Sequence, residues 1–559
     1  MRVDFVFLQL VVTLSINAVA FRTSFRRIPS LQAPARTSVV FLPASVEHQE
    51  DDTASSTSSI SVKHPAQKSM LEANSRLLSV LAVPPEPPKS RCQRFWEALP
   101  GTWAQREDSA LYPWESRDLD RVILNTAIPS IINMVAVPVV NAVDTFWVGR
   151  LGIALALAGQ AAANQAFFTI YFLVNYLPTI TAPLVASAVG SGNEEEARNR
   201  VCESLFLSNL LGIIGTLFLV VFPLQTLRLV LPAGAPATEY AAPYLRVRAM
   251  SMVPVLISAT GFAAFRGLLD TVTPLKVSMA TNMMNLILDP LMIFFTPLKV
   301  TGAAVATAVS EIFSGFTYTR LLLRQKLIRW SRVFRPPSKQ SLAPLLQGSV
   351  SMLGRQLAIN VALVAGARRA QTLDPTGVAA AAHSVVMQLY TIGILVHVAI
   401  QGTAATLVPS TLAKSGEEDA RRLADRILAW GSVAGILLGV AQFAAAMTLA
   451  PFFSTVPEVQ EAVKVPAILA SILHVINGPG VAGEGILLGL SNFRELMMFC
   501  STGVAAMIIA LASPLGKSLE GVFLSFMLFC GIQGALVVTH YLRWGKLAVK
   551  KISQSSPTI

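Results

Sequence analysis

PLVASAVGSGNEEEAR (183–198) and TLVPSTLAKSGEEDAR (406–421) are two copies of one motif, separated by 223 residues. Seven of the sixteen aligned positions are identical. A second pair of segments, AFRGLLD (264–270) and ILLGLSN (486–492), aligns at almost the same shift. Self-similarity at a constant spacing indicates a duplicated structural unit, and duplicated halves are common in transporters. The sequence therefore predicts two lobes with the same order of elements.

The composition excludes a water-soluble globular protein. The chain is 53% hydrophobic and only 14% charged, with a mean hydropathy of +0.57, whereas soluble domains are about 25% charged. Apolar segments long enough to cross a bilayer recur throughout the second part of the chain. We predict an all-α polytopic membrane protein with twelve transmembrane helices in two pseudo-symmetric six-helix lobes. The predicted spans are 122–149, 156–188, 199–223, 237–267, 274–297, 301–324, 343–369, 376–412, 420–447, 462–489, 495–514 and 519–543.

The basic residues behind the net charge of +12 concentrate at the ends of the apolar segments, where they would face the membrane surface. Lys and Arg gather in the loops after the second, fourth, sixth, eighth and tenth spans, and most densely in 320–340, which has no acidic residue. We call the side that carries these loops the basic side. Such clustering is the positive-inside pattern and attracts anionic headgroups, so membrane lipids are the expected partner and nucleic acid is not.

The N-terminus has the composition of a targeting leader. Residues 1–20 combine a short apolar stretch with Ala18-Val19-Ala20, the small-residue site of a signal peptide. Residues 21–46 are rich in Arg and Ser and free of acids, as transit peptides are. A signal peptide followed by such a segment beginning at Phe21 resembles the leader of complex plastids. We expect a plastid membrane, with an ordinary secretory leader to the plasma membrane or an endomembrane as the alternative. The other predicted regions are a disordered arm (47–118), the first lobe (119–325), a basic linker (326–342), the second lobe (343–543) and a basic tail (544–559).

Two of the carboxylates inside predicted spans are the most informative. Asp144 lies in NAVDTFWVGRLG (141–152), and Asp289 lies four residues after Asn285, on the same helix face. An ionised carboxylate at membrane depth is costly, so such residues usually face a water-filled cavity and have a function. For Asp144 the alternative is a helix cap or an ion pair with Arg150.

Several motifs together resemble the multidrug and toxic compound extrusion (MATE) family, in its DinF-like branch that includes plastid members of plants. The resemblance covers nearly all of 119–543 and implies cation-coupled efflux of organic solutes through twelve helices. The motifs are AIPSIINMVAVPVVNAVDTFWVGRLG (127–152), GSGNEEEAR (190–198), FRGLLDTVTPLK (265–276), NMMNLILDPLMIF (282–294), VTGAAVATAVS (300–310) and GEGILLGLSNF (483–493).

The resemblance also implies a coupling site in the first lobe, made of Asp144, Asn285, Asp289 and Thr307. Two carboxylates that share a low-dielectric pocket cannot both ionise cheaply, so H⁺ is a suitable coupling ion, and the oxygens of Asn285 and Thr307 suit Na⁺ equally well. No other cofactor and no structural metal is expected. Some branches carry an acid on the seventh helix, but 347–370 has none, which favours coupling through the first lobe. Further candidates for coupling or for the cavity wall are Glu484, Glu311, Asn175, Tyr176, Gln388 and Tyr390.

We therefore expect a monomeric secondary transporter that exchanges H⁺ or Na⁺ for a small organic solute by alternating access. A lipid-linked precursor flippase is the alternative. An enzyme is not expected, because the chain contains neither HExxH nor GxSxG. The spacing of Arg266 and Asp270 favours an ion pair on one helix face.

Overall fold

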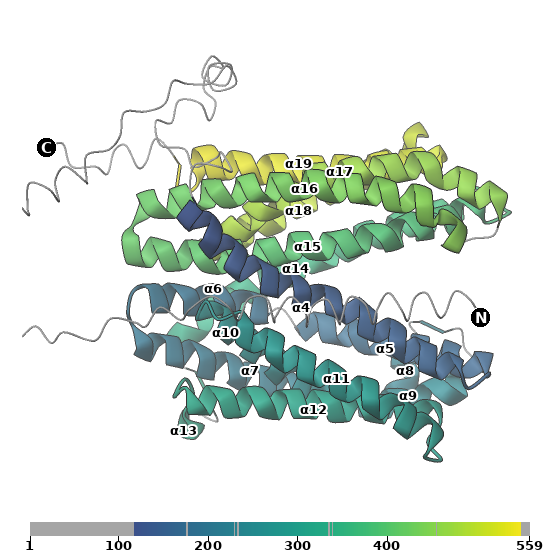
Figure 1. Cartoon of the computed structure of the whole chain (residues 1–559), viewed down its shortest axis with the longest axis horizontal. Coiled ribbons are helices and arrows are strands. Elements are labelled where there is room, and N and C mark those ends of the chain that lie inside the picture. Colours follow the sequence, from purple (N-terminus) through teal and green to yellow (C-terminus); the bar gives the residue numbers. More distant parts are fainter. Residues whose placement is uncertain are drawn as a thin grey trace, which may run out of the picture. The chain divides into compact units, whose positions relative to one another are not determined.

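The computed structural model (Figure 1) describes residues 117–548 apart from 175–176, 229, 232–233, 334–335, 338 and 454–455. These residues belong to one compact unit, Asp108–Ile559. The predicted signal peptide, the transit-like segment, nearly all of the arm and most of the tail lie outside the described residues. All regular elements of the described part are helical, which confirms the predicted all-α class.

The first lobe contains the six predicted spans, two of which are divided into two helices. Its last helix is followed by a short linker helix, α13 (Trp330–Val333). The helices of the lobe are α4 (Arg117–Gly149), α5 (Ala154–Val174), α6 (Leu177–Gly190), α7 (Glu194–Val221), α8 (Pro223–Leu227), α9 (Thr238–Ala249), α10 (Met252–Gly267), α11 (Val272–Phe294) and α12 (Val300–Arg324).

The second lobe contains six long helices, each of which corresponds to one predicted span. Its first helix begins at Lys339, a little before the predicted start at 343. A 3₁₀ turn and a π turn flank the last helix. The helices are α14 (Lys339–Gln371), α15 (Val378–Ser415), α16 (Glu417–Phe453), α17 (Pro457–Gly489), α18 (Phe493–Ala512) and α19 (Leu519–Thr539).

Twelve candidate spans follow from these helices. Among the described residues, ten helices are long and apolar enough to cross a membrane, and two bent helix pairs add two spans. The bends are 43° between α5 and α6 and 52° between α9 and α10. The corresponding second-lobe helices, α15 and α17, are continuous. The two lobes therefore share the order of their spans, but the second and fourth spans are broken only in the first lobe.

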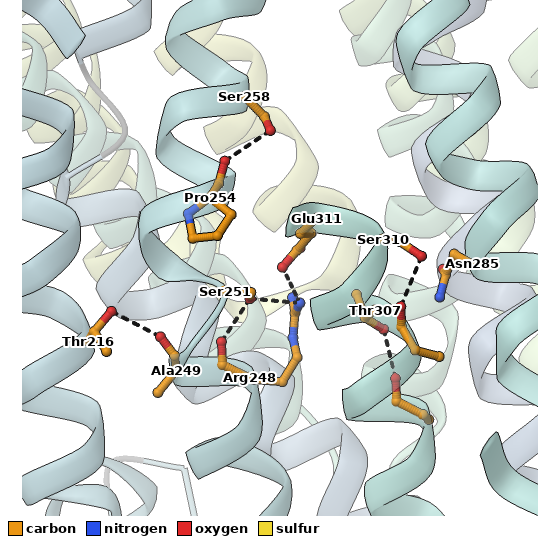
Figure 2. Close-up of polar contacts among 12 residues, drawn as sticks. Thr216, Arg248, Ala249, Ser251, Pro254, Ser258, Asn285, Thr307, Ser310 and Glu311 are labelled. Carbon is orange, nitrogen blue, oxygen red and sulfur yellow. Dashed lines mark hydrogen bonds and ion pairs between the residues drawn. The ribbon is translucent and has the colours of Figure 1, made fainter. Parts of the chain in front are cut away.

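The bend of the fourth span has a local cause. Pro254 lacks a backbone N–H, and its ring is sterically incompatible with the carbonyl four residues earlier, which favours a break or kink of the helix at this point. The hydroxyl of Thr216 donates to the carbonyl oxygen of Ala249 at 3.0 Å. The hydroxyl of Ser251 donates to the carbonyl oxygen of Arg248 at 2.8 Å, and Figure 2 shows both bonds at the break. Side-chain donors thus satisfy carbonyl groups at the interrupted helix end, as membrane burial requires.

The duplicated motif forms the turn between the second and third spans of each lobe. In the first copy, Gly192 adopts a left-handed φ of 73°, and the side chain of Asn193 caps α7 by accepting from the N–H of Glu196 at 3.0 Å. In the second copy, Gly416 aligns with Asn193 and has a φ of 91°. A left-handed residue ends the preceding helix in both copies, and glycine adopts this conformation without steric cost. The two copies therefore both form a helix–turn–helix, with the left-handed residue one position later in the second copy.

The lobes meet through an ion pair near the basic side. The Arg426 side chain on α16 is fully buried, and its Nε and Nη2 donate to the two carboxylate oxygens of Asp120 on α4, each at 2.6 Å. The indole N–H of Trp430 donates to the same carboxylate at 2.7 Å. A two-pronged guanidinium–carboxylate contact fixes orientation as well as distance. It joins the first helix of one lobe to the third span of the other, and Figure 1 shows α4 passing from its own lobe onto the second.

Glycines allow further close contact between the lobes on this side. Gly190, at the end of α6, lies directly against the backbone of Ser410 on α15, where a Cβ would overlap the Ser410 carbonyl oxygen. The guanidinium of Arg266 lies against Gly402, where a Cβ would overlap it. The predicted ion pair of Arg266 with Asp270 is wrong: the Asp270 carboxylate accepts instead from the backbone N–H of Thr273 at 2.9 Å.

Candidate functional site

Asp144 is buried near the end of α4. Its side chain is 8% exposed, and its Oδ1 has no hydrogen-bond partner among the described residues. Pro129 and Pro138 lie within the same helix. Arg150, the partner considered from the sequence, is exposed, and its guanidinium lies 4.9 Å from the ring centroid of Phe146. Asp144 is therefore neither a helix cap nor, among the described contacts, half of an ion pair with Arg150.

Asn285 and Asp289 lie on α11 and face Asp144. Both are buried, Asp289 completely, and the amide of Asn285 donates to Asp289 Oδ1 at 3.3 Å. The carboxyl groups of Asp289 and Asp144 are close enough to interact electrostatically. Asp289 Oδ2 has no hydrogen-bond partner within the described part of the chain. The structure thus brings three of the four predicted coupling residues together, with one carboxylate oxygen of each Asp unsatisfied.

Thr307, the fourth predicted residue, lies half-buried on α12, which packs against α11. Its hydroxyl donates to the carbonyl oxygen of Ala303 at 2.9 Å, so its lone pairs stay available to accept a hydrogen bond or to bind a cation. No hydrogen bond joins Thr307 to the other three residues in the described structure. The close approach of the two helices depends on Gly302, where a Cβ would overlap the Met292 carbonyl oxygen, three residues after Asp289. Gly302 is a positioning residue that the sequence reasoning missed.

An ion pair lies beside this carboxylate pair. Glu311, one helical turn after Thr307, accepts from Nη1 of Arg248 at 2.7 Å. Arg248 lies at the end of α9, two residues before the bend described above, and its side chain is almost fully buried. Figure 2 shows Arg248 between Glu311 and Ser251. Glu311 was predicted as a further candidate, but Arg248 was not predicted; the available signal was an Arg within a predicted span, shortly before a proline.

A matching arginine–glutamate pair lies in the second lobe. Glu484 on α17 is 4% exposed, and its carboxylate accepts from the guanidinium of Arg355 on α14. The amide of Gln401 donates to it at 2.6 Å, and the amide of Gln533 donates to its other oxygen. Both oxygens of Glu484 are therefore satisfied by the protein itself, unlike those of Asp144 and Asp289. This difference favours a structural role for Glu484 and a binding role for the first-lobe pair.

The remaining candidates are dispersed. Tyr390 is half-buried on α15, and its hydroxyl accepts from the amide of Asn477 at 2.5 Å. Gln388 is exposed on the same helix. Asn175 and Tyr176 lie outside the described residues.

Comparison with known proteins agrees with this architecture. The MatE family model matches residues 129–291, which include three of the four predicted coupling residues. The chain is 26% identical over 431 residues to "Protein DETOXIFICATION 44, chloroplastic" of Arabidopsis thaliana, covering 74% of this chain and 80% of that protein. It is 22% identical over 443 residues to "DNA damage-inducible protein F" of Escherichia coli, covering 76% and 92%.

Solved structures of MATE transporters share the fold. A MATE in complex with MaD3S superimposes with a TM-score of 0.68 at 19% identity, covering 76% of this chain and 96% of that one. A multidrug resistance MATE family transporter in an outward-facing conformation gives a TM-score of 0.68 at 20% identity, covering 78% and 98%. The MatE match over 129–291, the curated relatives and the shared fold thus make this chain similar to MATE transporters.

Proposed function

We propose that this protein is a secondary active transporter that exchanges H⁺ or Na⁺ for a small organic solute by alternating access. MATE relatives are transporters rather than enzymes, and several are named probable multidrug resistance proteins. The observation that carries the cation coupling is the buried pair of Asp144 and Asp289, which has two unsatisfied carboxylate oxygens. Two adjacent carboxylates in a low-dielectric site require a proton or a metal cation between them. We propose that the coupling ion meets this requirement reversibly.

Coupling follows if the ion and the solute prefer different conformations of the lobes. A ligand shifts a conformational equilibrium only by its differential affinity for the two states, and the coupling is reciprocal. In this account, the carboxylate pair binds the cation in one orientation of the lobes and releases it in the other. The gradient of the cation then drives the solute in the opposite direction.

The contacts between the lobes support the alternating-access part of the proposal. The basic-side half of the second span, α6, packs on α14, α15 and α17, whereas the main packing partners of its other half, α5, belong to its own lobe. The lobes thus contact each other through the basic-side half of this span. We propose that transport requires these contacts to part while the lobes approach on the opposite side. One chain carries both lobes, so a monomer suffices.

Flux in proteoliposomes tests the proposed function. Purified protein is reconstituted, and a pH or Na⁺ gradient is imposed with one of three probes: ethidium, quercetin or citrate. We expect gradient-dependent movement of at least one probe and its collapse when an ionophore dissipates the gradient. Lipid scrambling without solute movement would instead indicate a flippase, and covalent change of a probe would indicate an enzyme.

The leader provides a separate test of localisation, for which we propose a plastid membrane. Two relatives carry the word chloroplastic in their names. A fluorescent reporter fused to residues 1–60 is expected to enter the plastid of an alga with a complex plastid, and Phe21→Ala is expected to hold the reporter in the secretory system. Fluorescence microscopy with plastid and endomembrane markers measures this, and plasma-membrane accumulation of the unchanged leader would contradict the assignment.

A further inference from the structure

Arg248 is a buried cation that contacts three neighbouring helices. Its Nη1 donates to Glu311 on α12 at 2.7 Å and to the hydroxyl of Ser251, at the start of α10, at 3.4 Å. Its guanidinium carbon lies 4.3 Å from the ring centroid of Phe167 on α5. Its Nε has no hydrogen-bond partner among the residues that the structure describes. A guanidinium remains charged at all accessible pH values, so this charge is permanent.

The groups around Arg248 carry more negative than positive charge. Asp144 on α4 is close enough to interact electrostatically with both Arg248 and Glu311, and Asp289 on α11 adjoins Asp144. Glu311 and Asp144 therefore share one permanent cation, and the third carboxylate, Asp289, lies next to Asp144. The nearby side chains of Tyr171 and Tyr244 carry hydroxyl groups and are buried. An exchangeable cation would balance the excess negative charge at this place. The two unpartnered atoms are a hydrogen-bond donor, Arg248 Nε, and a hydrogen-bond acceptor, Asp144 Oδ1.

The position of Arg248 connects this charge to the bend of the fourth span. It lies two residues before the 52° bend between α9 and α10, whereas the corresponding span of the second lobe, α17, is continuous. Its carbonyl oxygen and its guanidinium both contact Ser251 across the break. A shift of the guanidinium therefore acts directly on the residues that set the bend.

We propose that Arg248 is a resident counter-ion that exchanges partner between Glu311 and Asp144 as the coupling cation binds and leaves, and so links occupancy of the Asp144–Asp289 pair to the bend of the fourth span. This inference rests on the proposed function. Departure of the cation makes the carboxylate pair more negative by one charge, whichever ion it is, and draws Arg248 toward Asp144. Binding of the cation returns Arg248 to Glu311.

We expect neutralisation of Arg248 and neutralisation of Glu311 to change the affinity for the coupling cation in opposite directions. Arg248→Gln removes the competing positive charge and should lower the cation concentration at half-saturation about tenfold. Glu311→Gln leaves Arg248 with Asp144 alone and should raise that concentration about tenfold. The double variant should return this concentration to near that of the unchanged protein. The readout is the shift of the unfolding temperature with Na⁺ at fixed pH and with pH in the absence of Na⁺, because ligand binding stabilises the folded state. Arg150→Gln, which removes an exposed arginine near the end of the same span as Asp144, is the control and should change nothing.

The link to conformation needs a second readout. Spin labels on cysteines at Phe295 and Gln371, both exposed on the side opposite the basic side, report the distance between the lobes. The four native cysteines are first replaced by alanine. We expect the cation to change this distance in the unchanged protein and not in Arg248→Gln, although Arg248→Gln still binds the cation. Arg248→Lys should restore part of the response.

The outcomes separate this inference from the proposed function. An unchanged cation-dependent distance in Arg248→Gln, or shifts of the same sign in Arg248→Gln and Glu311→Gln, would overturn the role of Arg248 alone. A cation response that persists in Asp289→Asn, or that is absent from the unchanged protein, would overturn the proposed coupling and this inference with it. If Arg248→Gln unfolds, Arg248→Lys and Glu311→Gln keep the sign test available.

Discussion

Asp289→Asn is expected to lower gradient-driven solute transport by about 10- to 100-fold. This range corresponds to the loss of a typical coupling free energy between two binding sites. The substitution keeps the size of the side chain and its bond with Asn285 but removes one of the two acids that share the coupling cation. The protein should therefore fold and still exchange solute between equal concentrations. Asp144→Asn should have the same effect, because the carboxyl groups adjoin each other in one buried site.

The double variant is the sharper test. Groups that act as one coupled unit give non-additive effects, so Asp144→Asn with Asp289→Asn should be no worse than either alone. The measurement is initial flux in proteoliposomes, with pH varied at constant Na⁺ and then Na⁺ varied at constant pH. Asp419→Asn, the same change at an exposed position on α16, is the matched control. Full flux in Asp289→Asn would show that its carboxylate is structural, and Glu484 would be the next residue to test.

Joining the lobes on the basic side is expected to stop transport completely. Gly190 and Ser410 are in backbone contact in the described state, and the exposed neighbouring positions Ser191 and Ala413 accept cysteines. A short bis-maleimide linker that contains a disulfide would then hold α6 to α15. If alternating access requires these helices to part, flux should fall to that of protein-free liposomes and return when the linker is reduced.

A linker within one lobe controls for the chemistry. Cysteines at Glu194 and Arg198, one turn apart on α7, lie in the same rigid helix, and linking them should leave flux unchanged. Circular dichroism and the elution volume in size-exclusion chromatography check that both linked proteins remain folded. Undiminished flux in fully linked Ser191–Ala413 protein would exclude separation of the lobes at this point.

Hydropathy and the repeat were sufficient to predict the spans, because each span must be apolar over a length fixed by the bilayer. The bend in the fourth span was not predicted. Pro254 is visible in the sequence, but the bend also depends on Thr216 from another helix, whose hydroxyl satisfies a carbonyl at the break. Such a donor is far away in sequence, so no local pattern indicates it.

The candidate site shows the same division between local and distant information. Asn285 and Asp289 share one helix face, so spacing alone places them together. Asp144 was singled out because it lies inside a predicted span, and the family resemblance assigned it to the same site. Arg248 and Glu311 are 63 residues apart, and no spacing rule connects them. The predicted pair of Arg266 with Asp270 failed because α10 ends at Gly267 and Leu269 adopts a left-handed φ of 62°, which ends the helical spacing before Asp270. Local rules therefore hold within a helix and fail at its ends and between helices.

Reverse coupling tests the central claim most directly, because linkage between cation and solute is reciprocal. Proteoliposomes are loaded with a transported probe, with no initial pH or Na⁺ gradient, and diluted into probe-free buffer while lumenal pH and Na⁺ are recorded by trapped indicators. The account predicts that outward probe movement draws H⁺ or Na⁺ into the lumen, and that Asp289→Asn releases the probe without moving either ion. Probe efflux from the unchanged protein with no movement of either ion, or an equal ion signal from Asp289→Asn, would contradict coupling through this carboxylate pair.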